Sequence, residues 1–357
     1  MSRYYPPEKI SDFVSENPQL PFKILGQSVE GRPIYGLSIG NGTKKILLWS
    51  QMHGNESTTT RALIQFLRAY VQGTSFPFLE DLKLYIILQL NPDGSKRFQR
   101  HNANDIDLNR DAQALTQPES QLLHQVFHSF QPDFALNLHG QRTIFAAGKG
   151  GEPATLSFLA PAADTACSLP PQRKIAMQVI AAIVDVMPTD LLHRIGRYDD
   201  TYNSNCVGDA FTTAGVPTLL FEAGHHPDDY QRNQTTAWVY NALLSCFECI
   251  ASESYLAFAV ADYLELPEND KGFVDMLWQN VNIQHGNTVY EAQQLAIQYQ
   301  ESLENNQIVL IPSFHSFGTY LGLRGHFEKQ YDQHEKSTVI HFEANQRVGF
   351  LENITFD

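Results

Sequence analysis

Two segments of the chain carry histidine and carboxylate side chains at a spacing that suits a metal ion. The segment QMHGNE places His53 and Glu56 three residues apart, directly after an apolar run, and His139 ends a second apolar run. Zinc binds imidazole nitrogen and carboxylate oxygen readily, and a catalytic zinc site uses three protein ligands with water in the fourth position. Taken alone, the first segment fits a capped turn better, and a histidine that ends a strand usually belongs to the core. Together they supply three ligands.

A further carboxylate, Glu222, ends the apolar run Pro217–Phe221. Burial of a carboxylate is costly unless the group is paired or takes part in chemistry, because burial disfavours its charged form. Next to a metal-bound water, Glu222 would be a natural general base. These residue types therefore favour metal-assisted hydrolysis.

Arginine and asparagine side chains follow another apolar run. The segment Asn91–Gly94 (NPDG) predicts a tight turn, and Arg100, Asn109 and Arg110 come after it. Two guanidinium groups and an amide suit a carboxylate and a developing oxyanion. Such arginines are more often solvated or ion-paired for structural reasons, so by themselves they do not decide a function.

The apolar runs that precede these residues have the length of β-strands. Apolar side chains fill both faces of each run, as in strands that are covered on both sides of a sheet. Helical periodicity lies between the runs, which predicts an α/β fold with a mixed, mostly parallel sheet and helices on both faces. The predicted strands are Lys45–Trp49, Leu82–Leu90, Phe134–Leu138 and Pro217–Phe221. The predicted helices are Thr58–Gln72, Glu119–Phe130, Lys174–Val186 and Gln234–Ser252.

All four polar clusters follow the C-terminal end of a predicted strand. In open parallel sheets, ligands bind at that edge, so the clusters are expected to converge on one site. The segment Ser57–Thr60 offers hydroxyl groups that would cap the first predicted helix beside it.

The polar, turn-rich stretch Asp262–Gly272 separates this pattern from a different one. Beyond it come one predicted helix, Glu291–Leu303, and several short strands. We interpret residues 1–256 as a catalytic domain and residues 267–357 as a small α+β or β-rich appendage of unknown role. The short predicted strands are Gln307–Pro312, Thr338–Phe342 and Gln346–Phe350.

The composition excludes some classes of partner. Lysine and arginine total 25 against 39 aspartate and glutamate, a net charge of -14. Nucleic acids and anionic membranes require a basic surface, so neither is an expected partner. We find no signal-like apolar leader and no apolar run of membrane-spanning length. The four cysteines are too few and too unevenly spaced for a disulfide framework, and we expect a cytoplasmic protein.

In their order, the motifs resemble those of the zinc carboxypeptidases related to carboxypeptidase A. The resemblance spans Ser28–His226 and rests on the lead-in EGRPI, then HGNE, NPDG, R-x-N with a following DLNR, a strand-terminal histidine and a strand-terminal glutamate. It implies a carboxypeptidase-like fold and one zinc ion per chain, held by His53, Glu56 and His139.

The resemblance also implies roles for the other candidates. Glu222 would be the general base and acid of the reaction. Arg100 would polarise the scissile carbonyl and stabilise the oxyanion, and Asn109 and Arg110 would bind the terminal carboxylate of the substrate.

Three further positions are compared with the family pattern. The mobile tyrosine that the family places before the catalytic glutamate corresponds to Tyr202, with Tyr198 as the other candidate. Gly140 stands where the family's peptidases often have serine. Gly208, next to Asp209, lies near the place of the residue that selects the substrate side chain, so no preferred side chain is predicted.

The predicted function is hydrolysis of a C-terminal peptide bond by a zinc metallocarboxypeptidase. An N-acyl amino acid deacylase of the succinylglutamate desuccinylase and aspartoacylase type is the nearest alternative, because it shares the metal triad and a glutamate followed by a small residue and glycine, as in Glu222–Gly224. A cell-wall peptide amidase is a third variant. NPDG and R-x-N favour the peptidase, and the intact ligands disfavour a binding module without turnover. The sequence predicts neither the physiological substrate nor the oligomeric state.

Overall fold

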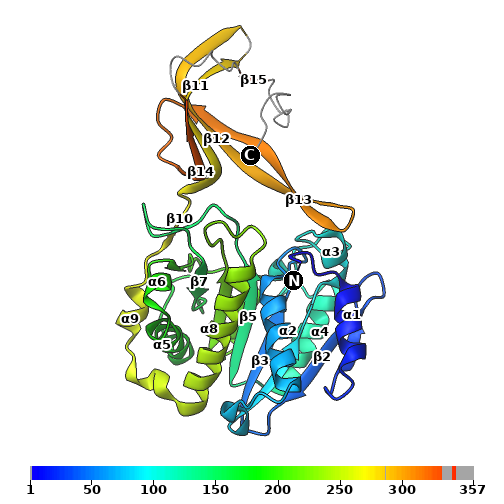
Figure 1. Cartoon of the computed structure of the whole chain (residues 1–357). Helices are drawn as coiled ribbons and strands as arrows, with labels where there is room; N and C mark the ends of the chain where they lie inside the picture. The colour runs from blue at the N-terminus through cyan, green and yellow to red at the C-terminus, as the bar shows by residue number, and fades with distance from the viewer. Residues whose placement is uncertain (1, 286, 332–339, 343–357) are drawn as a thin grey trace. The chain divides into compact units, whose positions relative to one another are not determined.

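The computed structural model in Figure 1 describes residues 2–285, 287–331 and 340–342. The chain divides into two compact units. The first comprises Met1–Arg142 and Ala147–Asn269, and the second comprises Thr143–Ala146 and Asp270–Asp357. The second unit therefore interrupts the first, and every candidate site residue lies in the first unit.

An eight-stranded sheet forms the centre of the first unit. Its strands are β1 (Lys23–Gln27), β2 (Pro33–Ile39), β3 (Lys44–Ser50), β4 (Leu82–Ile87), β5 (Phe134–Gly140), β7 (Leu156–Leu159), β8 (Ile195–Arg197) and β9 (Thr218–Ala223). The spatial order is β1-β2-β4-β3-β5-β9-β7-β8. Four of the seven neighbouring pairs are parallel, including the central run β4-β3-β5-β9. The prediction of a mixed, mostly parallel sheet is confirmed.

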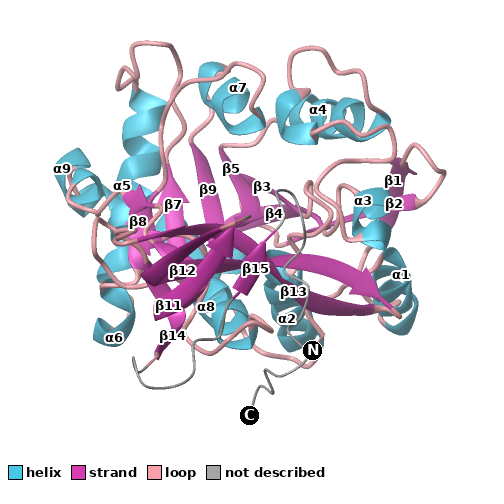
Figure 2. Cartoon of the chain, turned by 90° about the horizontal axis from the view of Figure 1, so that it is seen from above, coloured by secondary structure: helices cyan, strands magenta, loops and turns pink. Residues whose placement is uncertain are grey.

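Helices cover both faces of this sheet. The longer ones are α1 (Pro7–Glu16), α2 (Thr58–Val71), α4 (Pro118–Phe130), α5 (Pro171–Asp185), α7 (Val207–Thr213) and α8 (Asn233–Ser252). On β3, Ile46 and Leu48 pack into one core with α1, α2, α5 and α8, whereas Leu47 and Trp49 pack into a second core with α4 and α7. Figure 2 shows α4 and α7 on one side of the sheet and α2 and α8 on the other. This two-sided burial is why the strands are continuous apolar runs.

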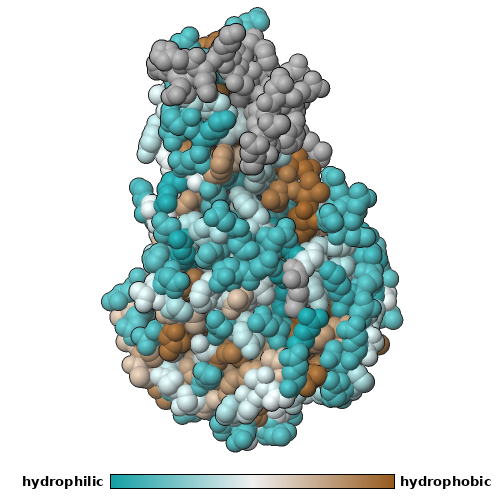
Figure 3. All heavy atoms as spheres, viewed as in Figure 1, coloured by the Kyte–Doolittle hydropathy of each residue, from teal (hydrophilic) through white to brown (hydrophobic). Residues whose placement is uncertain are grey.

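Short helices connect these elements. They are η1 (Pro77–Glu80), α3 (Pro92–Arg97), η2 (Leu108–Arg110), α6 (Thr189–Leu192), η3 (Ser254–Ala257) and α9 (Val260–Leu264). None of the helices in the described ranges is both long and apolar enough to cross a membrane. Figure 3 shows hydrophilic side chains over much of the face that it presents, with smaller hydrophobic areas between them. All four cysteines are free thiols.

Two local predictions for the first unit are wrong. NPDG does not form an isolated turn but begins α3, because Asn91 Oδ1 accepts the backbone N–H of Gly94 at 2.8 Å and Pro92 occupies the first helical turn. Proline is tolerated there because that N–H has no helical partner. Ser57 does not cap α2, since its hydroxyl donates to the carbonyl of Arg3 instead.

The second unit is built on a five-stranded sheet. Its strands are β11 (Phe273–His285), β12 (Thr288–Glu304), β13 (Gln307–Gly318), β14 (Arg324–Gln330) and β15 (Ile340–Phe342). Their order is β13-β12-β11-β14, and β15 also pairs with β11. Two short strands, β6 (Ala146–Ala147) and β10 (Asn269–Asp270), pair separately. A second sheet in the C-terminal part agrees with the predicted β-rich appendage, and the division into domains 1–256 and 267–357 stays a prediction.

The helix predicted over Glu291–Leu303 is wrong, because this segment lies within β12. Its alanine, glutamine and glutamate residues are good helix formers. Leu295 and Ile297, however, alternate toward an apolar cluster that contains Met276 and Trp278 of β11. Pairing with β11 and β13 along the strand outweighs the local preference.

The other strand predictions for this unit have mixed outcomes. Gln307–Pro312 is confirmed as the first half of β13. Within the predicted strand Thr338–Phe342, the last three residues form β15 and the others lie outside the described residues. The predicted strand Gln346–Phe350 lies outside them altogether.

Candidate active site

The register of the central sheet brings His139 and Glu222 together. The two residues are direct partners in the parallel pair of β5 and β9, so their side chains leave the same face of the sheet at neighbouring positions. β3 pairs with β5 on its other side, and the loop after β3 carries His53 and Glu56. Side chains from three adjacent strand ends therefore meet at one edge, where the sequence predicts them.

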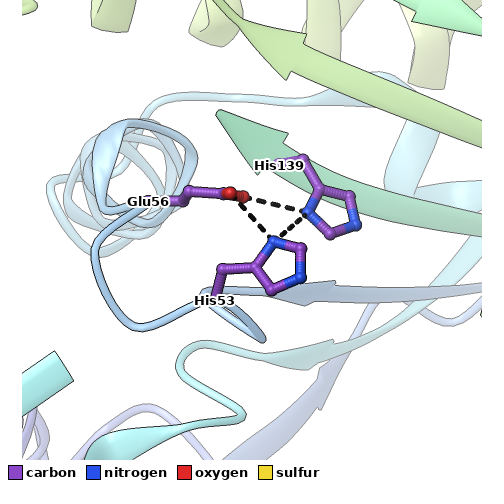
Figure 4. A group of neighbouring side chains, drawn as sticks. All are labelled: His53, Glu56 and His139. Atoms are coloured by element: carbon purple, nitrogen blue, oxygen red, sulfur yellow. Dashed lines mark hydrogen bonds and ion pairs between the residues drawn. The ribbon is translucent and has the colours of Figure 1, made fainter. Parts of the chain in front are cut away.

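His53, Glu56 and His139 form one cluster, drawn in Figure 4. His53 Nδ1 lies 2.8 Å from Glu56 Oε1, and His139 Nδ1 lies 2.9 Å from Glu56 Oε2. The two Nδ1 atoms are 3.1 Å apart. Ligands bonded to one tetrahedral zinc ion at about 2.0–2.1 Å lie about 3.3 Å from each other, so a small outward movement of the side chains would accommodate the ion. The three residues therefore fit a zinc site with two histidines and one glutamate.

The cluster is buried and has no counterpart elsewhere in the described ranges. Both histidines are only 2% exposed. Among the residues that the structure describes, no other group of three or more histidine, cysteine or acidic side chains converges in this way. Gly140 N also donates to Glu56 Oε2 at 2.9 Å. A Cβ at this glycine would make only ordinary contact with Glu56, at 3.4 Å, so the departure from serine is not required by space.

Asp107, to which sequence reasoning assigned no role, completes the cluster. Its Oδ1 lies 3.0 Å from His53 Nε2 and accepts the backbone N–H of Asn109 at 2.9 Å. Its Oδ2 accepts from Arg100 Nε at 3.0 Å and Nη2 at 2.9 Å. A carboxylate on the outer nitrogen fixes the tautomer and orientation of a metal-binding imidazole. In the sequence, Asp107 is visible as the first residue of the DLNR motif.

The charges of the cluster shift one another's pKa values. Burial opposes ionisation of Glu56, but His53 and His139 hold the pKa of that carboxyl well below its usual range. Burial also acts on His53, yet the Glu56 and Asp107 carboxylates raise the pKa of His53 above its ordinary value. For His139, burial dominates and lowers the pKa. The histidines thus differ although both face the same carboxylate.

Glu222 has the properties of a poised acid or base. Burial, followed by the charge of Glu56, raises the pKa of Glu222 well above its ordinary value, although Arg100 opposes the shift. Its Oε2 is buried and makes no hydrogen bond to any residue that the structure describes. A buried carboxylate oxygen without a partner is costly, so Glu222 is explained better by chemistry than by stability.

Of the two candidate tyrosines, Tyr198 interacts electrostatically with the carboxylates of this site. Burial raises the pKa of Tyr198, and the next contributions come from the charges of Glu222 and Glu56. Tyr198 directly follows β8, and its backbone N–H donates to Phe158 O of β7 at 2.9 Å. The assignment of Tyr202 as the mobile tyrosine stays a prediction.

The NPDG and R-x-N segments hold the loop that carries the candidate metal ligands His53 and Glu56. Asn91 Nδ2 donates to the carbonyls of Met52 at 3.1 Å and Arg100 at 3.3 Å. Gly54 packs so closely on this segment that a Cβ would lie 2.0 Å from the carbonyl carbon of Gly94. These backbone and amide contacts fix the position of the loop that carries His53 and Glu56.

The lead-in EGRPI is tied to the same segment. Asp93 of NPDG is fully buried and accepts hydrogen bonds from Ser28 Oγ at 2.8 Å and from the backbone N–H of Glu30 at 3.0 Å. Arg32 Nη1 lies 2.6 Å from Asp93 Oδ1. The charge of this buried aspartate is therefore compensated, and the lead-in has a structural role.

Asn109 and Arg110 lie in η2 and are held less tightly. Asn109 Oδ1 accepts the backbone N–H of Val207 at 3.0 Å, and its Nδ2 donates to none of the described residues. Arg110 is exposed, and its Nη1 contacts Asn109 O at 2.7 Å and Cys206 Sγ at 3.1 Å. No carboxylate in the described part of the chain forms an ion pair with Arg110. Both side chains can therefore donate to an incoming anion.

A protein-family model that matches the sequence identifies the family of this chain. A model of the Peptidase_M14 family, described as zinc carboxypeptidase, matches residues 8–206. This range covers more than half of the chain and includes the metal cluster, Asp107, Asn109 and Arg110. The chain belongs to the zinc carboxypeptidase family. Glu222 lies beyond the matched range.

Curated relatives that are named carboxypeptidases match shorter stretches of the chain. Probable carboxypeptidase 2 of Trichophyton verrucosum is 30% identical over 135 residues, which cover 34% of this chain and 25% of the relative. Carboxypeptidase A1 of Homo sapiens is 35% identical over 104 residues, which cover 26% of this chain and 25% of the relative. The chain thus spans about a quarter of the length of these relatives.

Solved structures share the fold. A metallo-carboxypeptidase from Burkholderia cenocepacia aligns with a TM-score of 0.55 at 19% identity, over 70% of this chain and 70% of that chain. Bovine thrombin-activatable fibrinolysis inhibitor aligns with a TM-score of 0.55 at 16% identity, over 70% of this chain and 98% of that chain. The predicted carboxypeptidase-like fold is confirmed.

Proposed function

We propose that this chain is a zinc-dependent carboxypeptidase that hydrolyses the C-terminal peptide bond of a substrate with a free carboxylate. The observation that carries the proposal is the convergence of His53, Glu56 and His139, with Glu222 next to His139 in the sheet register. Membership of the zinc carboxypeptidase family supports it.

Proton transfer is assigned to Glu222. Zinc held by the three ligands would lower the pKa of a water molecule to about 7 and polarise the scissile carbonyl. The unpartnered Oε2 of Glu222 is free to accept the proton of the attacking water and to deliver it to the departing amine. A nearby cation favours the ionised carboxylate that a general base requires, and so offsets the raised pKa of Glu222.

Arg100 is assigned to the oxyanion. Asp107 holds Nε and Nη2 of its guanidinium group, which leaves Nη1 on the side of Glu56, 3.5 Å from Oε1. A donor that is already oriented stabilises developing charge without reorganisation at the moment of reaction. The contacts to Asp107 thus support the role that the family resemblance implies.

The substrate carboxylate is assigned to Asn109 and Arg110. The free Nδ2 of Asn109 and the guanidinium group of Arg110 lie on consecutive residues, and neither is neutralised by a described carboxylate. Charge-assisted hydrogen bonds from such groups would fix the chain end, and holding the substrate in one orientation can lower the barrier by several kcal/mol.

For the tyrosine of the site, we assign Tyr198 in place of Tyr202. The electrostatic interaction of its phenol with Glu222 and Glu56 supports this choice. A phenol in that position can donate a hydrogen bond to the substrate next to the general base.

The proposal is tested by metal analysis and hydrolysis in one preparation. The purified chain is assayed with N-blocked dipeptides, with the same peptides amidated at the C-terminus, and with N-acyl amino acids. We expect one zinc ion per chain and cleavage of the free-carboxylate dipeptides, lost with a chelator and restored by zinc. Cleavage of the acyl amino acids alone would transfer the assignment to an N-acyl amino acid deacylase. Bound zinc without any hydrolysis would indicate a binding module.

A further inference from the structure

Two histidines of α4 face each other at the surface of the first unit. His124 and His128 are four residues apart, so they lie on the same face of the helix. Their Nε2 atoms are 2.9 Å apart, and their ring centroids are 4.2 Å apart. His128 is exposed and His124 is partly buried. They are separate from the buried cluster of His53, Glu56 and His139.

Neighbouring side chains hold both rings in this arrangement. The ring of Phe127 meets that of His128 edge-on, with centroids 5.3 Å apart at 86°. On the other side, His124 lines a small apolar cavity together with Leu115 and Leu123. Packing of this kind limits the available rotamers, so less side-chain entropy remains to be lost when both nitrogens bind one ligand.

No charged group competes for the pair. Within the described ranges, neither histidine forms an ion pair with a carboxylate, and the hydrogen bond between the two rings is the contact their Nε2 atoms make. Burial, followed by the charge of His128, lowers the pKa of His124. A neutral ring keeps the lone pair that a metal ion requires.

We propose that His124 and His128 form a second metal site, which takes a divalent ion of the nickel or copper class with water in the remaining positions. Two nitrogens bound at right angles and about 2.0–2.1 Å from one ion lie about 2.9 Å apart. This is the separation of the two Nε2 atoms. The ring that donates its Nε2–H moves that proton to its own Nδ1, so that both Nε2 lone pairs bind the ion and both imidazoles stay neutral.

The choice of ion follows from the ligands. Imidazole suits nickel, copper and zinc, and a square arrangement of nitrogen and oxygen ligands is characteristic of nickel and copper. Magnesium prefers oxygen ligands and keeps most of its water, so it is not expected to bind here. Nickel is the practical probe, because copper also reacts with free thiols such as those of this chain.

The experiment titrates the zinc-loaded full chain with nickel by isothermal titration calorimetry, while released zinc is measured in the same sample. We expect one nickel ion per chain, no loss of zinc, and no binding of magnesium. Absence of nickel binding, or nickel uptake matched by zinc release, would overturn the proposal.

Variants separate this site from other histidines. His128→Gln and His124→Gln each remove one ligand while keeping a good helix former. Either should weaken nickel binding on the order of tenfold or more, because the second ligand otherwise binds intramolecularly. His193→Gln, at an exposed histidine outside α4, is the matched control and should bind like the parent. Equal affinity of all four proteins would refute the site, and none of these readouts depends on peptidase activity.

Discussion

The candidate site has a metal side and a substrate side, which differ in how many contacts hold their side chains. On the metal side, both ring nitrogens of His53 and both oxygens of Glu56 are engaged, and Asp107 links the cluster to the loop behind it. On the substrate side, Arg110 is exposed and rests on one carbonyl and one thiol, and Asn109 keeps a free amide nitrogen. The side chains of the candidate metal half already hold one another in place, whereas those of the proposed substrate half keep donors that no described carboxylate neutralises.

This difference gives the two halves different responses to substitution. Changes on the metal side should alter zinc affinity or the chemical step, because each group there serves several others. Changes on the substrate side should alter KM and leave the zinc content intact. The predictions below test this separation.

Glu222→Gln should have the largest effect. Loss of the general base is expected to lower kcat by about 10²–10⁴-fold, with unchanged zinc content measured by elemental analysis. Because the buried carboxylate has a raised pKa and an unpartnered oxygen, the melting temperature should stay the same or rise. A variant that retains kcat would exclude Glu222 as the base, and one that loses zinc would show that it is part of the metal half.

Asp107→Asn should weaken zinc binding. The aspartate orients His53 through its outer nitrogen, and loss of such a partner typically costs about 10–100-fold in metal affinity. Competition with a chromogenic chelator measures this change. Asp105→Asn is the matched control, because Asp105 is a highly exposed neighbour that pairs only with His101 among the described residues. Equal zinc affinity of the two variants would contradict the link between Asp107 and the metal.

Arg110→Met should change substrate binding without changing the metal. The substitution keeps an unbranched side chain but removes the charge that is expected to bind the carboxylate, so KM should rise about tenfold while zinc content stays constant. Peptides with an amidated C-terminus provide the internal control, because their hydrolysis should be insensitive to the change. If KM rises equally for both peptide series, Arg110 does not bind the carboxylate.

Cys206→Ala should shift KM in the same direction by a smaller factor. The thiol contacts the Arg110 guanidinium at 3.1 Å and so acts as a positioning residue rather than a catalytic one. We expect KM to rise a few-fold with little change in kcat, and Cys206→Ser to restore it because a hydroxyl also accepts a hydrogen bond. A matching loss of kcat, or no rescue by serine, would contradict this role.

The smallest effect is expected from Asp209→Asn, seen in the pH dependence of stability. Burial raises the pKa of Asp209 to about 6, from an ordinary value of 3.8. The folded chain therefore holds this proton more tightly than the unfolded chain, and stability is lost as pH rises from about 4 to about 6. The asparagine variant lacks this pH-dependent contribution to stability. Between these pH values, the melting temperature of the parent should fall relative to that of the variant. At higher pH, the difference between the two should stay constant.

The sequence predicts the parts of this molecule that depend on local pattern. Buried strands are visible as apolar runs, and the polar residues at their ends mark the edge where a parallel sheet binds ligands. His53, Glu56 and His139 could be selected in this way, since their residue types already limit the chemistry. Glu222 could be selected because a carboxylate at the end of a buried strand needs an explanation.

The parts that sequence reasoning missed depend on contacts between distant residues. Asp107 is recognisable only when its distance to His53 is known, because an aspartate in a loop is usually solvated. Spacing favours Tyr202 over Tyr198, whereas the electrostatic interaction of Tyr198 with Glu222 depends on the fold and could not be predicted from spacing. The segment of β12 has a helix-favouring composition, but it forms a strand because it pairs with β11 and β13.

The interruption of the first unit has a consequence for how the protein can be dissected. Thr143–Ala146 leaves the catalytic sheet soon after β5, and its partners come from the far end of the chain: Phe273 N donates to Ile144 O at 3.1 Å, and His326 Nε2 lies 2.7 Å from Thr143 O. A stop codon after Asn269 would therefore not remove an independent tail. It would remove the hydrogen-bond partners of Thr143 and Ile144, which lie only a few residues after the candidate metal ligand His139.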